Sequence, residues 1–147
     1  MRFFLAGIMQ GSHLGMVLHN QDYRGRMKRL LLEHFPAADV YDPLADHANS
    51  LDYDDERGRQ VFLDHNQMCG EVDIVIAFVP EASMGTAIEM WEAYRHGRMV
   101  LTVSPLKHNW AVKFLSQHVF PDFEALEQAV TSGRLAEMWQ AWRAGLK

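Results

Sequence analysis

The chain has 147 residues, of which 48% are hydrophobic and 22% are charged, and these proportions are those of an ordinary globular protein. One domain spanning residues 1–147 is therefore expected. The net charge of −5 provides no basic surface for a nucleic acid polymer or an anionic membrane, so a small anionic ligand would have to be held by local groups. Cys69 is the single cysteine, which excludes an internal disulfide and predicts a reducing, cytoplasmic location.

The first predicted strand is the apolar run at 3–7, and a loop that contains Gly11 and Gly15 follows it. A glycine-rich loop directly after the first strand of an α/β sheet is typical of ligand-binding loops. Its spacing fits neither the dinucleotide fingerprint nor a P-loop. The amphipathic pattern at 22–35 then predicts a helix, and residues 39–41 predict a brief second strand.

The stretch at 42–56 is polar and rich in aspartate, and it is predicted to form a solvated loop over the ligand site. Its aspartates lack the spacing of a calcium-binding loop, and the histidines lack the spacing of a catalytic zinc motif. The sequence therefore predicts no metal. Residues 57–67 predict a helix, which places Asp64 just before the next strand.

The most informative unit runs from the apolar strand at 74–79 to the strand at 100–103. Ser83 stands where a helix N-cap is expected, good helix formers follow at 84–96, and Gly97 ends the pattern. A strand, a helix and a strand in this order predict a right-handed parallel crossover, whose ligand site lies at the carboxyl ends of the strands.

The start of this helix predicts an anion site with an acid beyond it. The backbone N–H groups of Met84, Gly85 and Thr86 have no helical acceptors and lie at the positive end of the helix dipole. Glu89 lies six residues after Ser83, which is roughly 9 Å along a helix axis at about 1.5 Å per residue. That distance is about the span from a 5′-phosphate to the anomeric carbon of a ribose.

The remaining pattern completes a five-stranded sheet. It predicts a helix at 110–118, an edge strand at 119–120, and closing helices at 123–132 and 134–145. Strands that alternate with helices in this way predict an α/β fold, a three-layer sandwich with a five-stranded parallel sheet of the flavodoxin-like (Rossmann-like) kind.

Several of these stretches resemble one family. Phe4-Leu5-Ala6-Gly7 ends the first strand, Tyr41-Asp42-Pro43 ends the second, Val72 to Ala77 forms the third, and Gly85-Thr86 is followed by Glu89. Together they are similar to the nucleoside 2-deoxyribosyltransferase superfamily over residues 2–103, with a weaker match to 109. That superfamily includes transferases that exchange the bases of deoxynucleosides and hydrolases that cleave the N-glycosidic bond of nucleoside 5′-monophosphates.

The resemblance implies roles for three residues. Glu89 matches the glutamate that attacks C1′ to form a glycosyl-enzyme intermediate, as in a retaining glycosidase. Asp64 is the best match for the carboxylate that protonates or orients the base. Ser83 stands where the monophosphate hydrolases carry a phosphate-binding serine and the transferases carry an acid, which would repel a phosphate.

The resemblance also implies the other contacts with the substrate, and it implies no cofactor. The predicted substrate-binding residues are Gly7, Met9, Gln10, Gly11, Tyr41, Ser83, Gly85, Thr86 and Asn109. Asn109 is similar to a polar residue that family members lend to a neighbouring active site, which implies a homodimer or a higher homo-oligomer.

Three functions remain open at this point. The leading hypothesis is hydrolysis of a (deoxy)ribonucleoside 5′-monophosphate through a glycosyl-Glu intermediate at Glu89. The first alternative is a transferase that hands deoxyribose to a second base. The second alternative is a protein that binds a nucleotide without turnover, and the large ring of Trp91, two residues after Glu89, motivates it.

Overall fold

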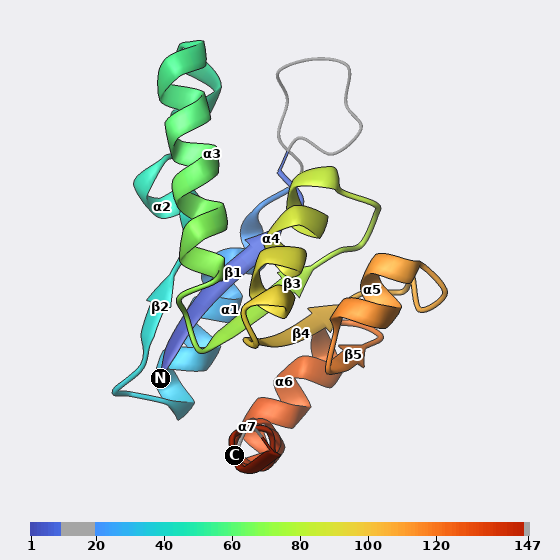
Figure 1. Ribbon diagram of the computed structural model, residues 1–147. Coiled ribbons are helices and arrows are strands. Elements are labelled where there is room, and N and C mark those ends of the chain that lie inside the picture. The colour runs from blue at the N-terminus through green and yellow to red at the C-terminus, as the bar shows by residue number, and fades with distance from the viewer. Residues whose placement is uncertain (10–19, 146–147) are drawn as a thin grey trace.

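The computed structural model describes residues 1–9 and 20–145 (Figure 1). Its sheet has five strands, all paired in parallel, in the spatial order β2-β1-β3-β4-β5. This is the flavodoxin-like strand order, so the predicted fold class is confirmed. The strands are β1 (Arg2–Gly7), β2 (Asp39–Tyr41), β3 (Ile74–Phe78), β4 (Met99–Val103) and β5 (His118–Phe120).

Helices cover both faces of the sheet, which gives three layers (Figure 1). One face is covered by α1 (Asp22–His34), α6 (Phe123–Thr131) and α7 (Arg134–Gly145). The other face is covered by α3 (Asp55–Cys69), α4 (Met84–Arg95) and α5 (Trp110–Leu115). The short α2 (Pro43–Asp46) and the 3-10 turn η1 (Ser50–Asp52) lie between β2 and α3.

Strand alternation divides the core into two clusters. Successive side chains of a strand point to opposite faces, and both faces of a parallel sheet are buried. Phe3 and Leu5 therefore pack toward α1 and α6, whereas Phe4 and Ala6 pack toward α3 and α4. All four side chains are buried to 1% exposure or less, so β1 is fixed in the centre of the molecule. Its last residue, Gly7, is thereby held at the carboxyl end of the sheet.

The predicted ends of α4 are confirmed. The Ser83 hydroxyl accepts a hydrogen bond from the Thr86 N–H and caps the helix. After the helix, Gly97 adopts a φ of +65°, which a residue with a Cβ rarely adopts. These two residues fix where α4 begins and ends. They thereby determine which side chains of α4 lie near the carboxyl end of β3.

Two predictions about the elements are wrong. Residues 42–56 form α2 and η1 in addition to loop, because Asp42 accepts a hydrogen bond from the Leu44 N–H and Pro43 occupies the first helical position. The helix that begins at Trp110 ends at Leu115, because the Gln117 N–H donates to the Val100 carbonyl and starts the pairing of β5. No helix within the described ranges is long and apolar enough to cross a membrane.

Candidate active site

A cavity of about 320 Å³ lies at the carboxyl ends of β1 and β3. It brings together most of the residues that the sequence singled out from distant segments. Its walls are Gly7, Met9, Phe62, His65, Ser83, Met84, Gly85, Thr86 and Glu89. The predicted anion cradle and the predicted nucleophile therefore face the same space.

The α4 wall offers hydrogen-bond donors at one end of the cavity. The Ser83 Oγ accepts hydrogen bonds from the Thr86 N–H, at 3.4 Å, and from the Thr86 hydroxyl, at 3.0 Å. Since both contacts use oxygen lone pairs, the Ser83 hydroxyl proton remains available for a ligand. The N–H groups of Met84 and Gly85 belong to the first turn of α4, where a helix provides no acceptor.

Glu89 is half-buried on the same helix, further from its start. Burial raises the pKa of Glu89 to about 8, and the positive charge of Arg24 opposes the rise. An exposed surface carboxyl would keep its ordinary pKa. A carboxyl whose pKa is shifted this far and that lines a cavity is a candidate catalytic residue.

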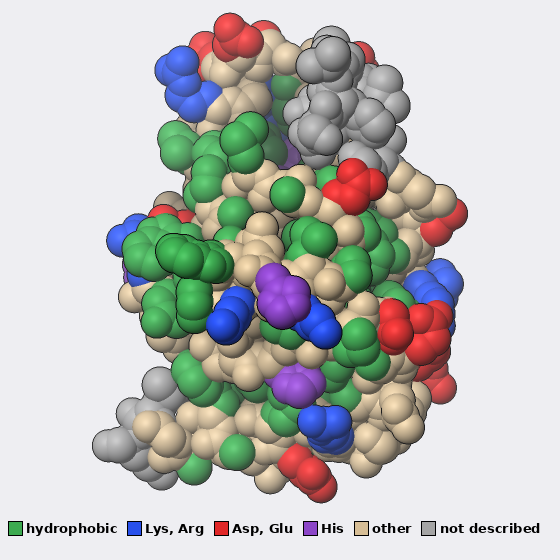
Figure 2. Space-filling model, turned by 90° about the vertical axis from the view of Figure 1, so that its right-hand side faces the viewer, with side chains coloured by type: hydrophobic (Ala, Val, Ile, Leu, Met, Phe, Trp, Pro, Cys, Tyr) green, Lys and Arg blue, Asp and Glu red, His purple; other side chains and the backbone are tan. Residues whose placement is uncertain are grey.

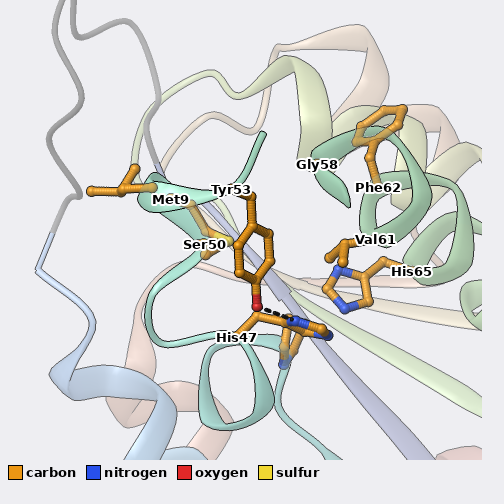
Figure 3. A pocket seen from close by; sticks show the side chains of 10 residues that line it. Met9, His47, Ser50, Tyr53, Gly58, Val61, Phe62 and His65 are labelled. Carbon is orange, nitrogen blue, oxygen red and sulfur yellow. Dashed lines mark hydrogen bonds between the residues drawn. The ribbon is translucent and has the colours of Figure 1, made fainter. Parts of the chain in front are cut away.

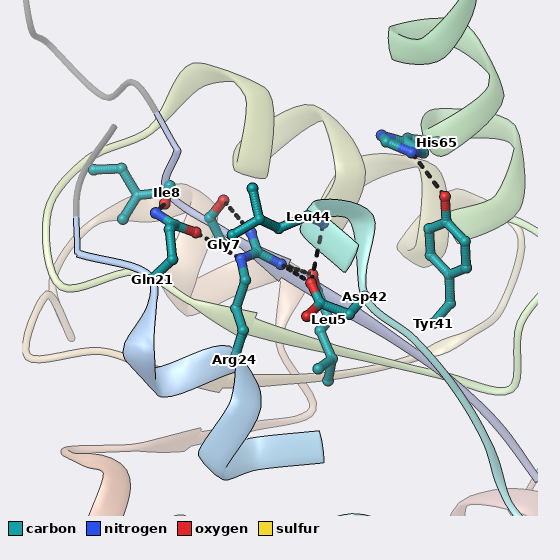
Figure 4. A network of polar contacts seen from close by, with 9 residues as sticks. All are labelled: Leu5, Gly7, Ile8, Gln21, Arg24, Tyr41, Asp42, Leu44 and His65. Atoms are coloured by element: carbon teal, nitrogen blue, oxygen red, sulfur yellow. Dashed lines mark hydrogen bonds and ion pairs between the residues drawn. The ribbon is translucent and has the colours of Figure 1, made fainter. Parts of the chain in front are cut away.

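Arg24 provides a fixed positive charge under the site. Its side chain comes from α1, is 2% exposed, and donates to the Leu5 carbonyl at 2.7 Å and to the Gly7 carbonyl at 3.1 Å. It also contacts the Asp42 carboxylate at 3.3 Å (Figure 4). Arg24 therefore ties the carboxyl ends of β1 and β2 together beneath the cavity, which a neutral side chain of similar length would not do.

The end of β1 requires a glycine at position 7, because the Tyr23 side chain lies too close for any Cβ. A Cβ built on Gly7 would lie 2.1 Å from the Tyr23 hydroxyl oxygen. The Tyr23 ring stacks on Phe78 at 4.1 Å, so it has little room to move away. The Tyr23 hydroxyl is buried, and no hydrogen-bond partner for it is found among the described residues.

A second cavity, of about 190 Å³, adjoins the first through Met9, Phe62 and His65, which line both (Figure 3). The described part of its lining contains no aspartate, glutamate, lysine or arginine. The His47 Nδ1 is 2.9 Å from the Tyr53 hydroxyl, and the rings of His47 and His65 are 5.1 Å apart. The other residues that line this cavity are Pro43, Ser50, Leu51, Gly58 and Val61.

Asp64, the predicted proton handler, lies away from both cavities. It is exposed on α3, and its Oδ1 accepts a hydrogen bond from the Gln60 amide at 2.7 Å. The next residue, His65, faces the cavities, and its Nε2 is 3.0 Å from the Tyr41 hydroxyl (Figure 4). Burial, followed by the charge of His47, lowers the pKa of His65 to about 4, so the ring is neutral at pH 7.

The other predicted residues are only partly gathered at the site. Met9 lines both cavities, whereas Gln10 and Gly11 lie outside the described residues. Tyr41 contacts the site through His65. Asn109 caps α5 by accepting hydrogen bonds from the Ala111 and Val112 N–H groups, and it lines a separate cavity on the other side of the α4 start.

Sequence reasoning missed Arg24, His47, Tyr53 and His65. For two of them a signal was present. His65 continues the buried stripe of α3 at helical spacing from Val61 toward Cys69, and Asp64 does not. Arg24 likewise shares the buried face of α1 with Met27 and Leu31. His47 and Tyr53 had no such signal, because they come from the segment that was predicted to be irregular.

Similarity to known proteins is found by comparing structures and not by comparing sequences. No protein-family model matches the sequence, and no curated protein matches it either. A solved structure of a 2-deoxyribosyltransferase from Bacillus psychrosaccharolyticus superposes with a TM-score of 0.64 at 17% identity, over 86% of this chain and 90% of that one. A conserved protein from Enterococcus faecalis V583 gives 0.65 at 16% identity, over 89% and 97%. A CMP N-glycosidase from Clostridium botulinum gives 0.54 at 19% identity, over 89% and 98%.

The chain shares its fold with these proteins. The predicted resemblance to the nucleoside 2-deoxyribosyltransferase superfamily is thereby confirmed at the level of the fold. At these identities the likeness carries the fold and no substrate, so activity has to be argued from the site itself.

Proposed function

We propose that this protein is an enzyme that hydrolyses the N-glycosidic bond of a ribonucleoside or deoxyribonucleoside 5′-monophosphate. The observation that carries the proposal is that the Ser83 cap, the first amides of α4 and Glu89 line one cavity. The donors suit a phosphate, and the acid lies about one sugar length further along the helix. A CMP N-glycosidase with this fold supports the same reaction class.

In the proposed reaction, the Glu89 carboxylate forms a bond to C1′ while the C1′–N bond breaks and its electron pair remains on the base. Water then attacks C1′ of the glycosyl ester, which restores the carboxylate and releases the sugar phosphate and one proton, and this proton balances the one that the departed base takes up. The donors at Ser83, Gly85 and Thr86 would hold the 5′-phosphate during both steps. Arg24, buried beneath the cavity, favours the ionised form of Glu89 that the first step needs.

A base-exchange reaction is the second candidate, because the 2-deoxyribosyltransferase structure superposes at least as well as the glycosidase structure. The two reactions share the glycosyl-Glu89 intermediate and differ only in whether water or a second base attacks it. The proposed hydrolase and a transferase therefore predict different products from the same mixture.

One assay separates these candidates. The protein is incubated with a panel of nucleosides and nucleoside 5′-monophosphates, each with and without a different free base, and the products are resolved by chromatography. Free base with sugar phosphate supports hydrolysis, and a new nucleoside supports transfer. Saturable binding without any product would favour the non-catalytic alternative.

We also propose that two copies associate through the face formed by α3, α4 and α5. Among the described residues, all the large hydrophobic side chains that are exposed lie on these helices except Leu32, and they include Met84 at 86% and Trp110 at 77% exposure. Figure 2 looks onto the side of the molecule where α5 lies and shows hydrophobic patches there. A stable dimer buries about 800 Å² per partner, and this set of side chains is large enough to supply most of that area.

Sedimentation of the wild-type protein measures this association. The exchange Trp110→Glu places a charge within the proposed interface, at its most exposed aromatic side chain among the described residues, and is expected to shift the protein to a monomer. The matched control is Leu32→Glu, which places the same charge on the opposite face of the sheet. A wild-type protein that sediments as a monomer at micromolar concentration would contradict the proposal.

A further inference from the structure

His65 lies where the two cavities meet. It lines the cavity of Glu89 and also the adjoining cavity of His47 and Tyr53. If C1′ of a substrate lies at Glu89, its base extends past Met9 and His65 into the second cavity. His65 is therefore placed beside the bond that breaks, whereas the exposed side chain of Asp64 is not.

The second cavity suits an uncharged ring. Apart from Ser50, its walls are apolar or aromatic, and none of the described residues that line it is an aspartate, glutamate, lysine or arginine. The His47 Nδ1 is already close to the Tyr53 hydroxyl, at 2.9 Å. Of the polar groups in this cavity, His65 is the one that also lines the Glu89 cavity, so it is the polar group nearest to the reacting bond.

Tyr41 determines what the His65 ring can offer. The Tyr41 ring stacks on Phe4 at 5.5 Å, which holds its hydroxyl 3.0 Å from the His65 Nε2. When this hydroxyl donates to Nε2, a neutral imidazole carries its proton on Nδ1. The ring is neutral at pH 7, because burial and then His47 lower the pKa of His65 to about 4. The Nδ1–H is then a donor that Tyr41 does not use.

We propose that His65, in place of Asp64, is the catalytic residue that contacts the leaving base. Its Nδ1–H donates a hydrogen bond to an acceptor atom of the base, and Tyr41 is the residue that positions the His65 ring. This inference rests on the proposed function and names a residue for the departure of the base. It also restricts the substrate to bases that have an acceptor beside the glycosidic nitrogen, as the pyrimidine O2 and the purine N3 are.

The proposed step balances. The electron pair of the C1′–N bond stays on the base, and the Nδ1–H hydrogen bond stabilises the charge that develops there. A water molecule gives a proton to the departing base and becomes hydroxide. Hydrolysis of the glycosyl ester at Glu89 later releases one proton, which neutralises that hydroxide, so the imidazole starts and ends the cycle in the same neutral form.

The test compares adjacent residues and two kinds of leaving group. His65→Ala is expected to lower kcat about 100-fold for the best nucleoside 5′-monophosphate of the panel, as the loss of one preorganised donor does in other enzymes. With the 4-nitrophenyl glycoside of the same sugar 5-phosphate, whose leaving group needs no such donor, the loss should be less than about 5-fold. Asp64→Ala, the matched control, should stay within about 2-fold for both substrates.

Conservative variants supply a readout that a merely structural role would not give. The amide nitrogen of Asn reaches the position of Nδ1, so His65→Asn should recover at least about 10-fold of the activity lost in His65→Ala. The amide of Gln reaches the position of Nε2, so His65→Gln should recover less. Tyr41→Phe should lower kcat about 5-fold for the nucleotide alone, because the ring loses the contact that fixes its tautomer. If His65→Ala fails to fold, the comparison of Asn with Gln decides.

The assignment is overturned if Asp64→Ala loses as much activity as His65→Ala, if both leaving groups are affected equally, or if Gln restores activity better than Asn. A wild-type protein that releases no base from any substrate refutes the proposed function instead. In that case the contact is tested by NMR of the imidazole nitrogens during titration with free bases. A shift of the His65 Nδ1 signal is expected, and no shift with any base overturns the contact.

Discussion

The two halves of the candidate site are built in different ways. The half that would hold the sugar and phosphate comes from one helix start, where Ser83, Gly85 and Glu89 follow one another within α4. The half that would hold the base comes from three segments, which contribute His47, Tyr53 and His65. The first half depends on local helix geometry, whereas the second depends on how α2, η1 and α3 are brought together by the fold.

This difference is also one of charge. The α4 half combines a helix dipole, the buried cation Arg24 and the carboxyl of Glu89. The described residues that line the other half include no aspartate, glutamate, lysine or arginine, and His65 is neutral at pH 7 because burial, followed by the charge of His47, lowers its pKa to about 4. We therefore expect the α4 half to set the rate and the preference for phosphate, and the α3 half to set which base is accepted.

The largest expected effect comes from Glu89→Gln. Gln keeps the shape of the side chain but cannot form the glycosyl ester, so base release should fall roughly 10³-fold or more. Base release is measured by chromatography with the best substrate of the panel. Turnover at the wild-type rate would remove Glu89 from the mechanism.

The same variant carries its own control for folding. The folded carboxyl has a pKa of about 8 and the unfolded one an ordinary value of 4.5, so between these values the unfolded state loses a proton that the folded state keeps. The stability that wild-type Glu89 contributes is thus fully present below about pH 4.5 and declines as the pH rises toward 8. Gln does not titrate, so the variant should gain in melting temperature over the wild type from pH 5 to pH 8.

The half built on local helix geometry could be predicted from the sequence more fully than the half assembled from separate segments. Ser83, Gly85 and Glu89 could be placed because an N-cap and a helix period fix their relative positions without any tertiary knowledge. The five-stranded parallel sheet could be predicted because buried apolar runs alternate with helical patterns. Asp64 was predicted from the resemblance, as the best match for a carboxylate before the third strand, and its place on the helix period, which directs it to solvent, did not enter that prediction. His47 and Tyr53 face a common cavity only through tertiary contacts, which no local pattern records.

The pH profile is the next largest effect. The carboxylate is the active form of Glu89, and kcat/KM reports the pKa of the free enzyme. Since burial raises that pKa to about 8, kcat/KM should rise roughly tenfold per pH unit from pH 5 to pH 7 and level off above pH 8. Initial rates at low substrate concentration measure the profile. A plateau that begins near pH 5 would show that Glu89 is already ionised in the free enzyme.

Ser83→Asp tests the phosphate end of the α4 half. The new carboxylate places like charge beside a bound 5′-phosphate and removes a charge-assisted hydrogen bond of about 1.5 to 3 kcal/mol, so kcat/KM for monophosphates should fall at least about tenfold. Nucleosides should be unaffected or improved, and Ser83→Ala, which keeps the backbone amides, should lose less. Equal losses of kcat/KM for nucleosides and nucleotides would show that Ser83 only caps α4 and does not contact the phosphate. They would favour base exchange.

The smallest expected effect comes from Tyr53→Phe, in the half that would hold the base. It removes the hydroxyl that lies 2.9 Å from the His47 Nδ1 but keeps the ring, which packs edge-on against His47 with a centroid distance of 5.9 Å. Without this contact His47 can turn away from the base, and the loss of one neutral hydrogen bond to the base, about 0.5 to 1.5 kcal/mol, should raise KM about 2- to 10-fold while kcat stays the same. Tyr94→Phe is the matched control, because Tyr94 is exposed on α4 outside both cavities and should leave KM unchanged. If Tyr53→Phe instead lowers kcat with KM unchanged, the Tyr53 hydroxyl acts in the transition state, and the division between a half that sets the rate and a half that selects the base is wrong.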